Sequence, residues 1–275
     1  MVVVIEMTRK AILVALLLVG CGGGEAAAPV PERPADTLVV LSDANRLTAI
    51  DAESGRRVTR RVRSLPACGA DLFVTGGHIV FSAVVRGATT VYSVPLTLDR
   101  RPRRLGTAHV FLPSAVDGRV WLAGTDCDHS ASHGLREVTV DGEVTFERAG
   151  PMPGDWFAGV VPEGLVMLDE REDFVWDPRT GRTAETSFDP DAVPSPDRSL
   201  IALPVCVRDR CSVSLGGARI RGSGTGRWYP ELSWSAGGRL FIRDGFRVKT
   251  YRPGDARAER LPFRLPRSTV AIAAG

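Results

Sequence analysis

Leu38-Val39-Val40-Leu41 is the first of six short apolar runs, each preceded by turn residues, and their spacing decides the fold. The other five runs are His78–Phe81, Arg119–Leu122, Leu165–Leu168, Leu200–Leu203 and Arg239–Ile242. Successive runs begin 40, 41, 46, 35 and 39 residues apart. This period predicts repeated four-stranded β-units, each too small to bury both faces of its sheet without a neighbour, as in a β-propeller. No stretch keeps a period of 3.6 residues, so we expect almost no helix.

Each unit also repeats internally as an inner strand, a turn, the apolar run, a loop, a third strand and a more polar fourth strand. The third strands are expected at Arg46–Asp51, Thr90–Val94, Leu135–Val140, Phe174–Asp177, Ser212–Leu215 and Phe246–Tyr251. Several are followed by turn residues, as at Asp51–Gly55, Asp177–Gly181 and Arg252–Asp255. The alternation of strands and turns predicts an all-β fold.

The first and last units are incomplete in a complementary way. The first unit begins at Leu38 with its second strand, whereas Ser268–Ala273 is a strand without followers. If this last strand supplies the missing inner strand of the first unit, the ring closes without an open edge, which would otherwise promote aggregation. We therefore predict a six-bladed β-propeller over residues 37–275, closed by the C-terminal strand. The alternatives are five or seven blades, or a pair of β-sandwiches.

Three stretches resemble blades of known propellers. Leu47–Gly55 (LTAIDAESG) is similar to a blade of the quinoprotein-like propellers. Leu232–Leu240 (LSWSAGGRL) and Pro194–Leu200 (PSPDRSL) are similar to the WSPDG turns of TolB-like, WD40-like propellers. The resemblance covers three blades well and the others loosely. It implies the fold and no particular function, because such turns occur in enzymes, receptors and scaffolds alike.

The N-terminal residues predict an export signal. Two basic residues, Arg9 and Lys10, precede the apolar stretch Ala11–Gly20, which is about half of the ~20 residues that a membrane-spanning helix needs. Its length is that of a signal peptide. Leu18–Cys21 resembles the lipobox of bacterial lipoproteins, in which the cysteine sulfur receives diacylglycerol and becomes residue one of the mature chain. An ordinary secretory signal is the alternative.

This resemblance implies three segments and a location. Residues 1–20 are the predicted signal peptide, residues 21–36 the lipidated Cys21 with a flexible Gly- and Pro-rich tether, and residues 37–275 the propeller. We expect an exported protein anchored to the cell membrane through lipidated Cys21. In a cell with two membranes, Gly22 after the cysteine would by resemblance favour the outer membrane.

The cysteine count fits an oxidising compartment. With Cys21 assigned to lipid, four of the five cysteines remain, an even number that permits two disulfides. Cys206 and Cys211 lie across a tight hairpin turn and form the favoured pair. Cys68 with Cys127 follows by elimination. A Cys-x-x-Cys metal or redox spacing is absent from the sequence.

Composition argues against a nucleic-acid partner. The formal net charge is +3, and no basic field is present in the sequence. Arginine supplies nearly all the cations, since Lys10 and Lys249 are the only lysines in the sequence, and we interpret this as a bias of composition and not a binding signal. A hydrophobic content of 44% supports a sizeable core. We expect a monomer.

The loops between blades and the loops after each second strand emerge on one face of a propeller, and polar residues gather in them. The predicted ligand-binding face comprises Asp71, His109, Asp155, Trp156, Asp191, Trp228, Tyr229, Glu231 and Arg267. Acidic and aromatic groups mixed in this way suit a sugar, a peptide or a cationic ligand. The alternative is that Trp156 and Trp228 pack between blades while the charges are merely solvated.

One loop contains residue types that bind metals. Asp126, Asp128, His129 and His133 lie within eight residues and could hold a divalent cation. The favoured alternative is a solvated loop held by Cys127, because no second ligand cluster or general base is evident. No phosphate-binding glycine loop, nucleophile elbow or histidine triad is present in the sequence.

These observations favour a lipid-anchored, non-enzymatic propeller that presents a binding or scaffolding face to envelope proteins or glycans. We expect no catalytic residue and no cofactor. One alternative is an envelope hydrolase or lyase, metal-assisted through the four residues just named. The other is a quinone-dependent dehydrogenase, although the usual calcium ligands and stacking tryptophan of that class cannot be placed in this sequence.

Overall fold

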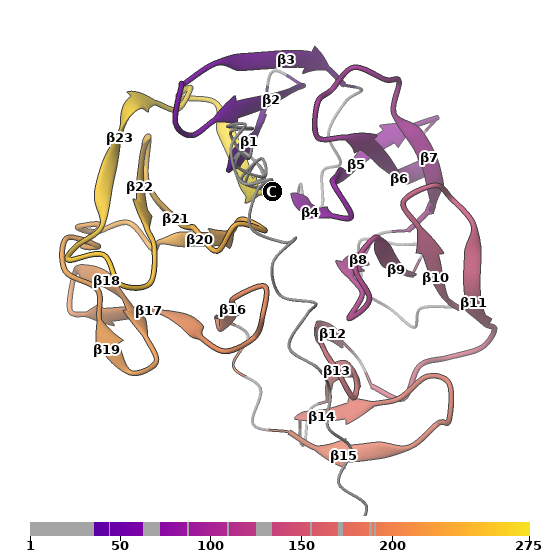
Figure 1. The fold of residues 1–275 in the computed structure, drawn as a ribbon. Helices are drawn as coiled ribbons and strands as arrows, with labels where there is room; N and C mark the ends of the chain where they lie inside the picture. Colours follow the sequence, from indigo (N-terminus) through magenta and orange to yellow (C-terminus); the bar gives the residue numbers. More distant parts are fainter. Residues whose placement is uncertain are drawn as a thin grey trace, which may run out of the picture. The chain divides into compact units, whose positions relative to one another are not determined.

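The computed structural model describes residues 36–43, 45–62, 72–86, 88–108, 110–124, 134–154, 156–169, 173–186, 189 and 191–275, with only the backbone at position 156. All of them belong to one compact unit, Pro34–Gly275. They form six four-stranded antiparallel sheets. Figure 1 shows the sheets as blades around a central axis, with β4, β8, β12, β16 and β20 toward the axis and β3, β7, β11, β15, β19 and β23 at the rim. The six-bladed β-propeller is confirmed.

The first three blades, in order from the inner to the outer strand, have the following bounds. Blade 1 contains β24 (Thr269–Ala274), β1 (Thr37–Ser42), β2 (Arg46–Asp51) and β3 (Arg57–Arg61). Blade 2 contains β4 (Leu72–Thr75), β5 (His78–Val85), β6 (Ala88–Pro95) and β7 (Arg103–Thr107). Blade 3 contains β8 (Val110–Pro113), β9 (Arg119–Ala123), β10 (Leu135–Thr139) and β11 (Val144–Arg148).

The other three blades follow the same order. Blade 4 contains β12 (Trp156–Val161), β13 (Gly164–Leu168), β14 (Asp173–Trp176) and β15 (Thr183–Glu185). Blade 5 contains β16 (Val193–Pro194), β17 (Ile201–Val207), β18 (Arg210–Leu215) and β19 (Ala218–Arg219). Blade 6 contains β20 (Glu231–Trp234), β21 (Leu240–Asp244), β22 (Arg247–Tyr251) and β23 (Glu259–Arg264).

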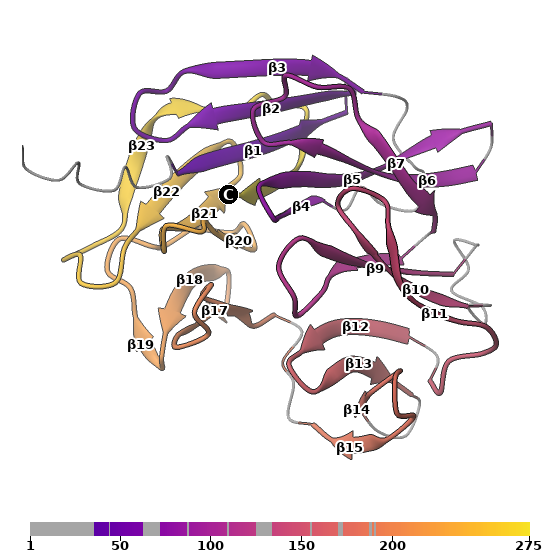
Figure 2. The ribbon, with the colours of Figure 1, turned by 45° about the vertical axis from the view of Figure 1, so that its right-hand side comes forward.

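The ring closes through β24, as the sequence predicts. β24 pairs antiparallel with β1, from Leu38 opposite Ala274 to Ser42 opposite Thr269. Figures 1 and 2 both place the C-terminal end beside β1. Two backbone bonds between Thr37 and Gly275, each 2.9 Å, extend the pairing past the strand end. Strands more than 200 residues apart in the sequence therefore complete one sheet.

Asp36 fixes the start of β1 to blade 6. Its side chain is only 2% exposed and forms ion pairs with Arg239 at 2.8 Å and with Arg252 at 2.5 Å. The Ser235 hydroxyl donates a further hydrogen bond of 2.6 Å to the same carboxylate. A buried carboxylate satisfied in this way holds the closing sheet against its neighbour.

The core is divided among the contacts between neighbouring blades. Five apolar clusters join blade 6 to 1, 1 to 2, 2 to 3, 3 to 4 and 5 to 6. Ile272 and Ala274 of β24 belong to the first of these clusters, and Ala273 belongs to the second. Alternate residues of one strand thus pack on opposite sides, as the period of two in a β-strand requires.

The contact between blades 4 and 5 is different. Within the part of the chain that the structure describes, no core cluster joins these two blades. Ala202 of β17 packs toward blade 6, and the alternate positions Ile201, Val205 and Val207 are 47%, 43% and 68% exposed. Among the described residues, this contact is therefore the one of the six that has no apolar cluster across it.

We call the side of the ring that carries the connections between blades, together with the loops from each second strand to the third, the upper face. The opposite side is the lower face. Because β1 is a second strand, it runs from the lower face to the upper face, and Asp36 lies on the lower face. Among the described residues there is no helix of the length and apolarity needed to cross a membrane.

Candidate functional site

Two large aromatic side chains are exposed on the upper face, in the connection from blade 5 to blade 6. The side chain of Trp228 is 61% exposed and that of Tyr229 is 56% exposed. Trp228 is thus not buried between blades. Together with Asp189 and Asp191, which lie in the connection from blade 4 to blade 5, these residues form what we call the aromatic–acidic patch.

A disulfide-closed hairpin supports the turn that carries the patch. Cys206 and Cys211 are bonded at the end of the β17–β18 hairpin, which confirms the predicted pair. The Cys211 amide donates to the Gly226 carbonyl, and the Thr225 amide donates to the Cys211 carbonyl, each at 2.9 Å. The Thr225 hydroxyl then donates to the Trp228 carbonyl at 2.6 Å. A covalent link and three hydrogen bonds therefore fix the backbone beneath Trp228.

Blade 6 holds the same loop from the other side. Lys249 of β22 is buried, and its ammonium donates to the Gly224 carbonyl while lying 3.8 Å from the Asp244 carboxylate. Burial lowers the pKa of Lys249 below its ordinary value, against the opposing effect of Asp244. The Trp228 indole also lies over Gly245, where an added Cβ would come within 3.4 Å of Nε1. This distance is ordinary van der Waals contact, and the φ of +59° is what favours glycine at position 245.

Tyr229 and Asp191, both predicted to lie on the ligand-binding face, are brought together. Partial loss of water around the phenol, a hydrogen bond to Asp191 and the charges of Asp191 and Asp189 raise the pKa of Tyr229 to about 12. The hydroxyl therefore stays protonated at any physiological pH and donates to the Asp191 carboxylate. This contact links the connection entering blade 5 to the connection entering blade 6.

Glu231, predicted for the same face, has a structural partner for each of its oxygens. The Arg243 Nη1 donates to one oxygen at 2.6 Å, and the Ile272 amide donates to the other at 2.7 Å. Arg243 in turn donates to the Thr269 carbonyl at 2.7 Å. Glu231 and Arg243 therefore fasten β24 to blade 6. Arg267, in the connection to β24, is exposed.

Several predicted residues lie outside the described residues. They are Cys21, Cys68, Asp71, His109, Asp126, Cys127, Asp128, His129, His133 and Asp155. Trp156 begins β12, where its backbone pairs with Leu168. The second disulfide, the lipidation and the metal site thus stay predictions. Among the described side chains, no group of three or more His, Cys, Asp and Glu residues is placed to hold a metal ion.

A buried carboxylate that the sequence analysis did not single out lies between blades 3 and 4. The side chain of Glu137 on β10 is 2% exposed. It accepts hydrogen bonds from Ser114 at 2.6 Å and Thr145 at 2.7 Å, and pairs with Arg179 at 2.7 Å and Arg119 at 3.2 Å. Burial would raise the pKa of Glu137, but these hydrogen bonds and the arginine charges outweigh it and lower the pKa. Both carboxylate oxygens accept from structural donors, so we assign Glu137 to stability.

The comparisons with known proteins concern the fold. No protein-family model matches this chain, and no curated protein matches it. A chain of the nidogen/laminin complex is 12% identical over 87% of this chain and 98% of that chain, with a TM-score of 0.51. A protein of unknown function from Bacteroides caccae is 14% identical over 88% and 99%, with a TM-score of 0.50. TolB from Acinetobacter baumannii is 13% identical over 87% and 66%, with a TM-score of 0.55. At these identities the similarity shows the β-propeller fold alone, and the fold is one shared with TolB.

Proposed function

We propose that the protein is a non-enzymatic binding module of the cell envelope, anchored to a membrane through lipidated Cys21, which binds an envelope protein or glycan through the aromatic–acidic patch. The observation that carries this proposal is the exposure of Trp228 and Tyr229 on a backbone fixed by a disulfide and by hydrogen bonds. Large aromatic side chains that remain in water on a rigid turn are typical of binding surfaces, where they contribute most of the binding energy.

The acidic residues of the patch favour a partner with a positively charged group. Asp189 and Asp191 place negative charge beside Tyr229. The indole of Trp228 can accept a cation against its ring face, a contact worth about 0.5–1 kcal/mol at an exposed site. A protein segment with a Lys or Arg side chain satisfies both features. A sugar ring stacked on Trp228 with hydroxyls donating to the carboxylates is the second candidate.

The position of the chain's entry into the ring supports the same assignment. Asp36 lies on the lower face, so the predicted tether joins the ring on the side opposite to the patch. A module anchored by that tether would have the patch on the side away from its attachment point, accessible to a partner.

The patch is tested by capture from detergent-solubilised envelopes with the wild-type chain and the double variant Trp228→Ala/Tyr229→Ala. We expect the double variant to capture at least about tenfold less of the partner protein than the wild type does. The reason is that aromatic residues at binding hot spots contribute about 2 kcal/mol or more each. The matched control is Val144→Ala on β11, a side chain 51% exposed in another blade, which should change nothing. Glycan arrays probed with the same three proteins test whether the partner is a sugar. Equal capture and equal glycan binding by wild type and double variant would refute the assignment of the patch.

The anchor is tested separately by Cys21→Ser. The wild-type chain should fractionate with membranes and carry a diacylglycerol mass on its N-terminal peptide, because two acyl chains at roughly 0.8 kcal/mol per buried methylene give stable attachment. The Cys21→Ser variant should carry no diacylglycerol mass and should not begin at position 21. An unmodified, uncleaved wild-type N-terminus by mass spectrometry would contradict the lipoprotein assignment without affecting the test of the patch.

A further inference from the structure

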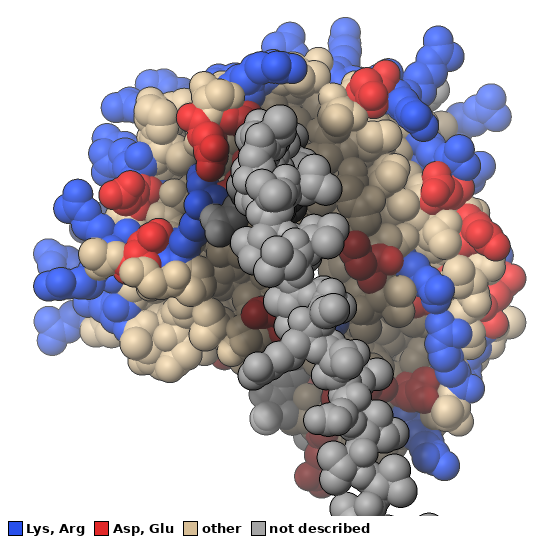
Figure 3. Space-filling view, in the orientation of Figure 1, with Lys and Arg blue, Asp and Glu red and all other residues tan. Residues whose placement is uncertain are grey.

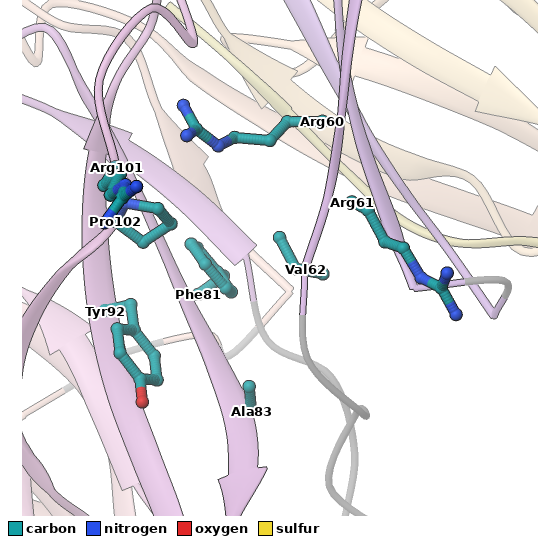
Figure 4. A pocket seen from close by; sticks show the side chains of 8 residues that line it. All are labelled: Arg60, Arg61, Val62, Phe81, Ala83, Tyr92, Arg101 and Pro102. Carbon is teal, nitrogen blue, oxygen red and sulfur yellow. The ribbon is translucent and has the colours of Figure 1, made fainter.

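A cavity of about 490 Å³ lies where blade 1 meets blade 2, away from the aromatic–acidic patch. Its lining comes from the end of β3 and the following residue, from β5 and β6, and from the residues just before β7. Figure 4 shows the eight lining side chains, which are Arg60, Arg61, Val62, Phe81, Ala83, Tyr92, Arg101 and Pro102. The volume lies within the range of about 300–1,000 Å³ that is typical of small-molecule sites.

The floor of this cavity is apolar and aromatic. Val62, Phe81 and Ala83 are 9%, 2% and 0% exposed. The rings of Phe81 and Tyr92 are stacked, with their centroids 5.8 Å apart and their planes 23° apart. Tyr92 is only half-buried, so an apolar or aromatic body that covers its ring gains roughly 25 cal/mol per Å² of apolar area removed from water.

The charged residues among the described part of the lining are all arginines. Arg60 reaches from β3 to blade 2, where its Nη1 donates to the carbonyls of Leu98, at 3.0 Å, and Arg100. In Figure 4 this guanidinium extends toward the side of the cavity on which Arg101 lies, whereas Arg61 points away from both. None of the ion pairs among the described residues involves any of these three arginines.

The surroundings add to the positive charge. The segments 56–61 and 100–104 each contain four arginines and meet at this place in the ring. Figure 3 shows Lys and Arg side chains along the part of the rim where Figure 1 places β3 and β7. A concentration of one sign of charge beside an apolar cavity raises the local concentration of ions of the opposite sign.

We propose that this cavity binds a small amphipathic anion, which is a carboxylate or a phosphate group carried on an apolar chain or ring. The anionic head lies between the guanidinium groups of Arg60 and Arg101, and the apolar body covers Phe81 and Tyr92. Guanidinium groups suit both anionic head groups, because their planar N–H donors can form two parallel hydrogen bonds to the oxygens of a carboxylate or a phosphate. Arg60 is already held by two carbonyls, so little conformational entropy is lost when its remaining N–H groups bind an anion.

The test is a calorimetric titration of the full chain carrying Cys21→Ser, so that no acyl chain attached to the protein can compete with the probes. The probes are dodecanoate, dodecyl phosphate, the uncharged dodecyl maltoside and inorganic phosphate, each below its micelle concentration where it has one. We expect saturable one-to-one binding of dodecanoate, dodecyl phosphate or both, with affinity that falls as salt is added. A preference between the two identifies the head group as a fatty-acid carboxylate or a lipid phosphate. The uncharged amphiphile and inorganic phosphate should bind at least about tenfold more weakly.

Two variants separate a specific site from a generally basic rim. Arg101→Ala removes one guanidinium of the site and should weaken binding about tenfold, since a hydrogen bond to a charged group contributes about 1.5–3 kcal/mol. Arg61→Ala makes the same change of charge at the side chain that points away and should weaken binding less than about threefold. Both arginines are exposed, so both variants should keep the wild-type melting temperature. Equal weakening by the two variants, unchanged binding in Arg101→Ala, or equal binding of the uncharged amphiphile would overturn the proposal.

Discussion

A chain truncated before Thr269 is expected to lose its cooperative fold. β24 completes the sheet of blade 1 and contributes to two of the five core clusters. Without it, β1 becomes an open edge, the apolar residues of β1 are exposed, and Glu231 with Arg243 loses its bonds to Thr269 and Ile272. The combined loss should exceed about 5 kcal/mol, the lower end of the stability of a domain.

Circular dichroism during heating and size-exclusion chromatography provide the measurement. The truncated chain should melt without a sigmoidal transition and associate through its open edge. Two point variants on β24 compare a buried with an exposed position, since Ile272 is 4% exposed and Val270 is 42% exposed. Ile272→Ala should cost about 2–4 kcal/mol, and Val270→Ala about 0.5 kcal/mol or less. A truncated chain with the wild-type melting temperature would show that the ring is closed in some other way.

Glu137→Gln is expected to lower the free energy of unfolding by about 1.5–3 kcal/mol at neutral pH, because the partly exposed Arg179 and Arg119 lose their charge-assisted hydrogen bonds to the buried carboxylate. The amide keeps the size of the side chain, but only one of its two polar atoms accepts, so the hydrogen bond from Ser114 or the one from Thr145 is lost together with the charge. Denaturant unfolding of wild type and variant measures the difference.

The effect of Glu137 should depend on pH in a defined direction. Its pKa is lowered in the folded protein, so the carboxylate contributes its full stabilisation above the ordinary glutamate pKa, and the contribution is lost as pH falls through the lowered value. The difference between wild type and Glu137→Gln should therefore shrink in acid. Glu147→Gln is the matched control, since Glu147 pairs with Arg136 at 2.7 Å but both side chains are more than half exposed. This control should cost less than about 1 kcal/mol, and an equal cost for both variants would contradict the role of Glu137.

The strands could be predicted because each carries a local pattern. The run Arg119–Leu122 became β9, Arg119–Ala123, and the third strand expected at Arg46–Asp51 is β2 with the same bounds. The prediction was less accurate where pairing extends a strand beyond its apolar run. The run expected at Leu200–Leu203 became β17, which continues to Val207 because Cys206 and Val207 pair with Cys211 and Arg210 across the disulfide hairpin.

The sites were harder to predict, because they depend on contacts between blades. Glu231 looks like a rim carboxylate in the sequence, and its partner Ile272 lies beside it only after the ring has closed. Asp36 and Glu137 carry no local signal of burial, since Glu137 follows Arg136 and Asp36 precedes Thr37, and the arginines that pair with them come from other parts of the chain. The many arginines were interpreted as a bias of composition. Three of them line a cavity only because β3 packs beside blade 2 in the folded chain.

The contact between blades 4 and 5 has a consequence for how the ring moves. Separating any other pair of neighbouring blades disrupts an apolar cluster, whereas separating these two disrupts none of the five that the described residues form. Thermal fluctuations of lowest energy should therefore widen this one joint, turning the toroid briefly into a horseshoe whose two arms stay connected through β24 and β1. Asp189 and Asp191 lie in the peptide that crosses the joint, so its opening would displace acidic groups of the proposed recognition surface.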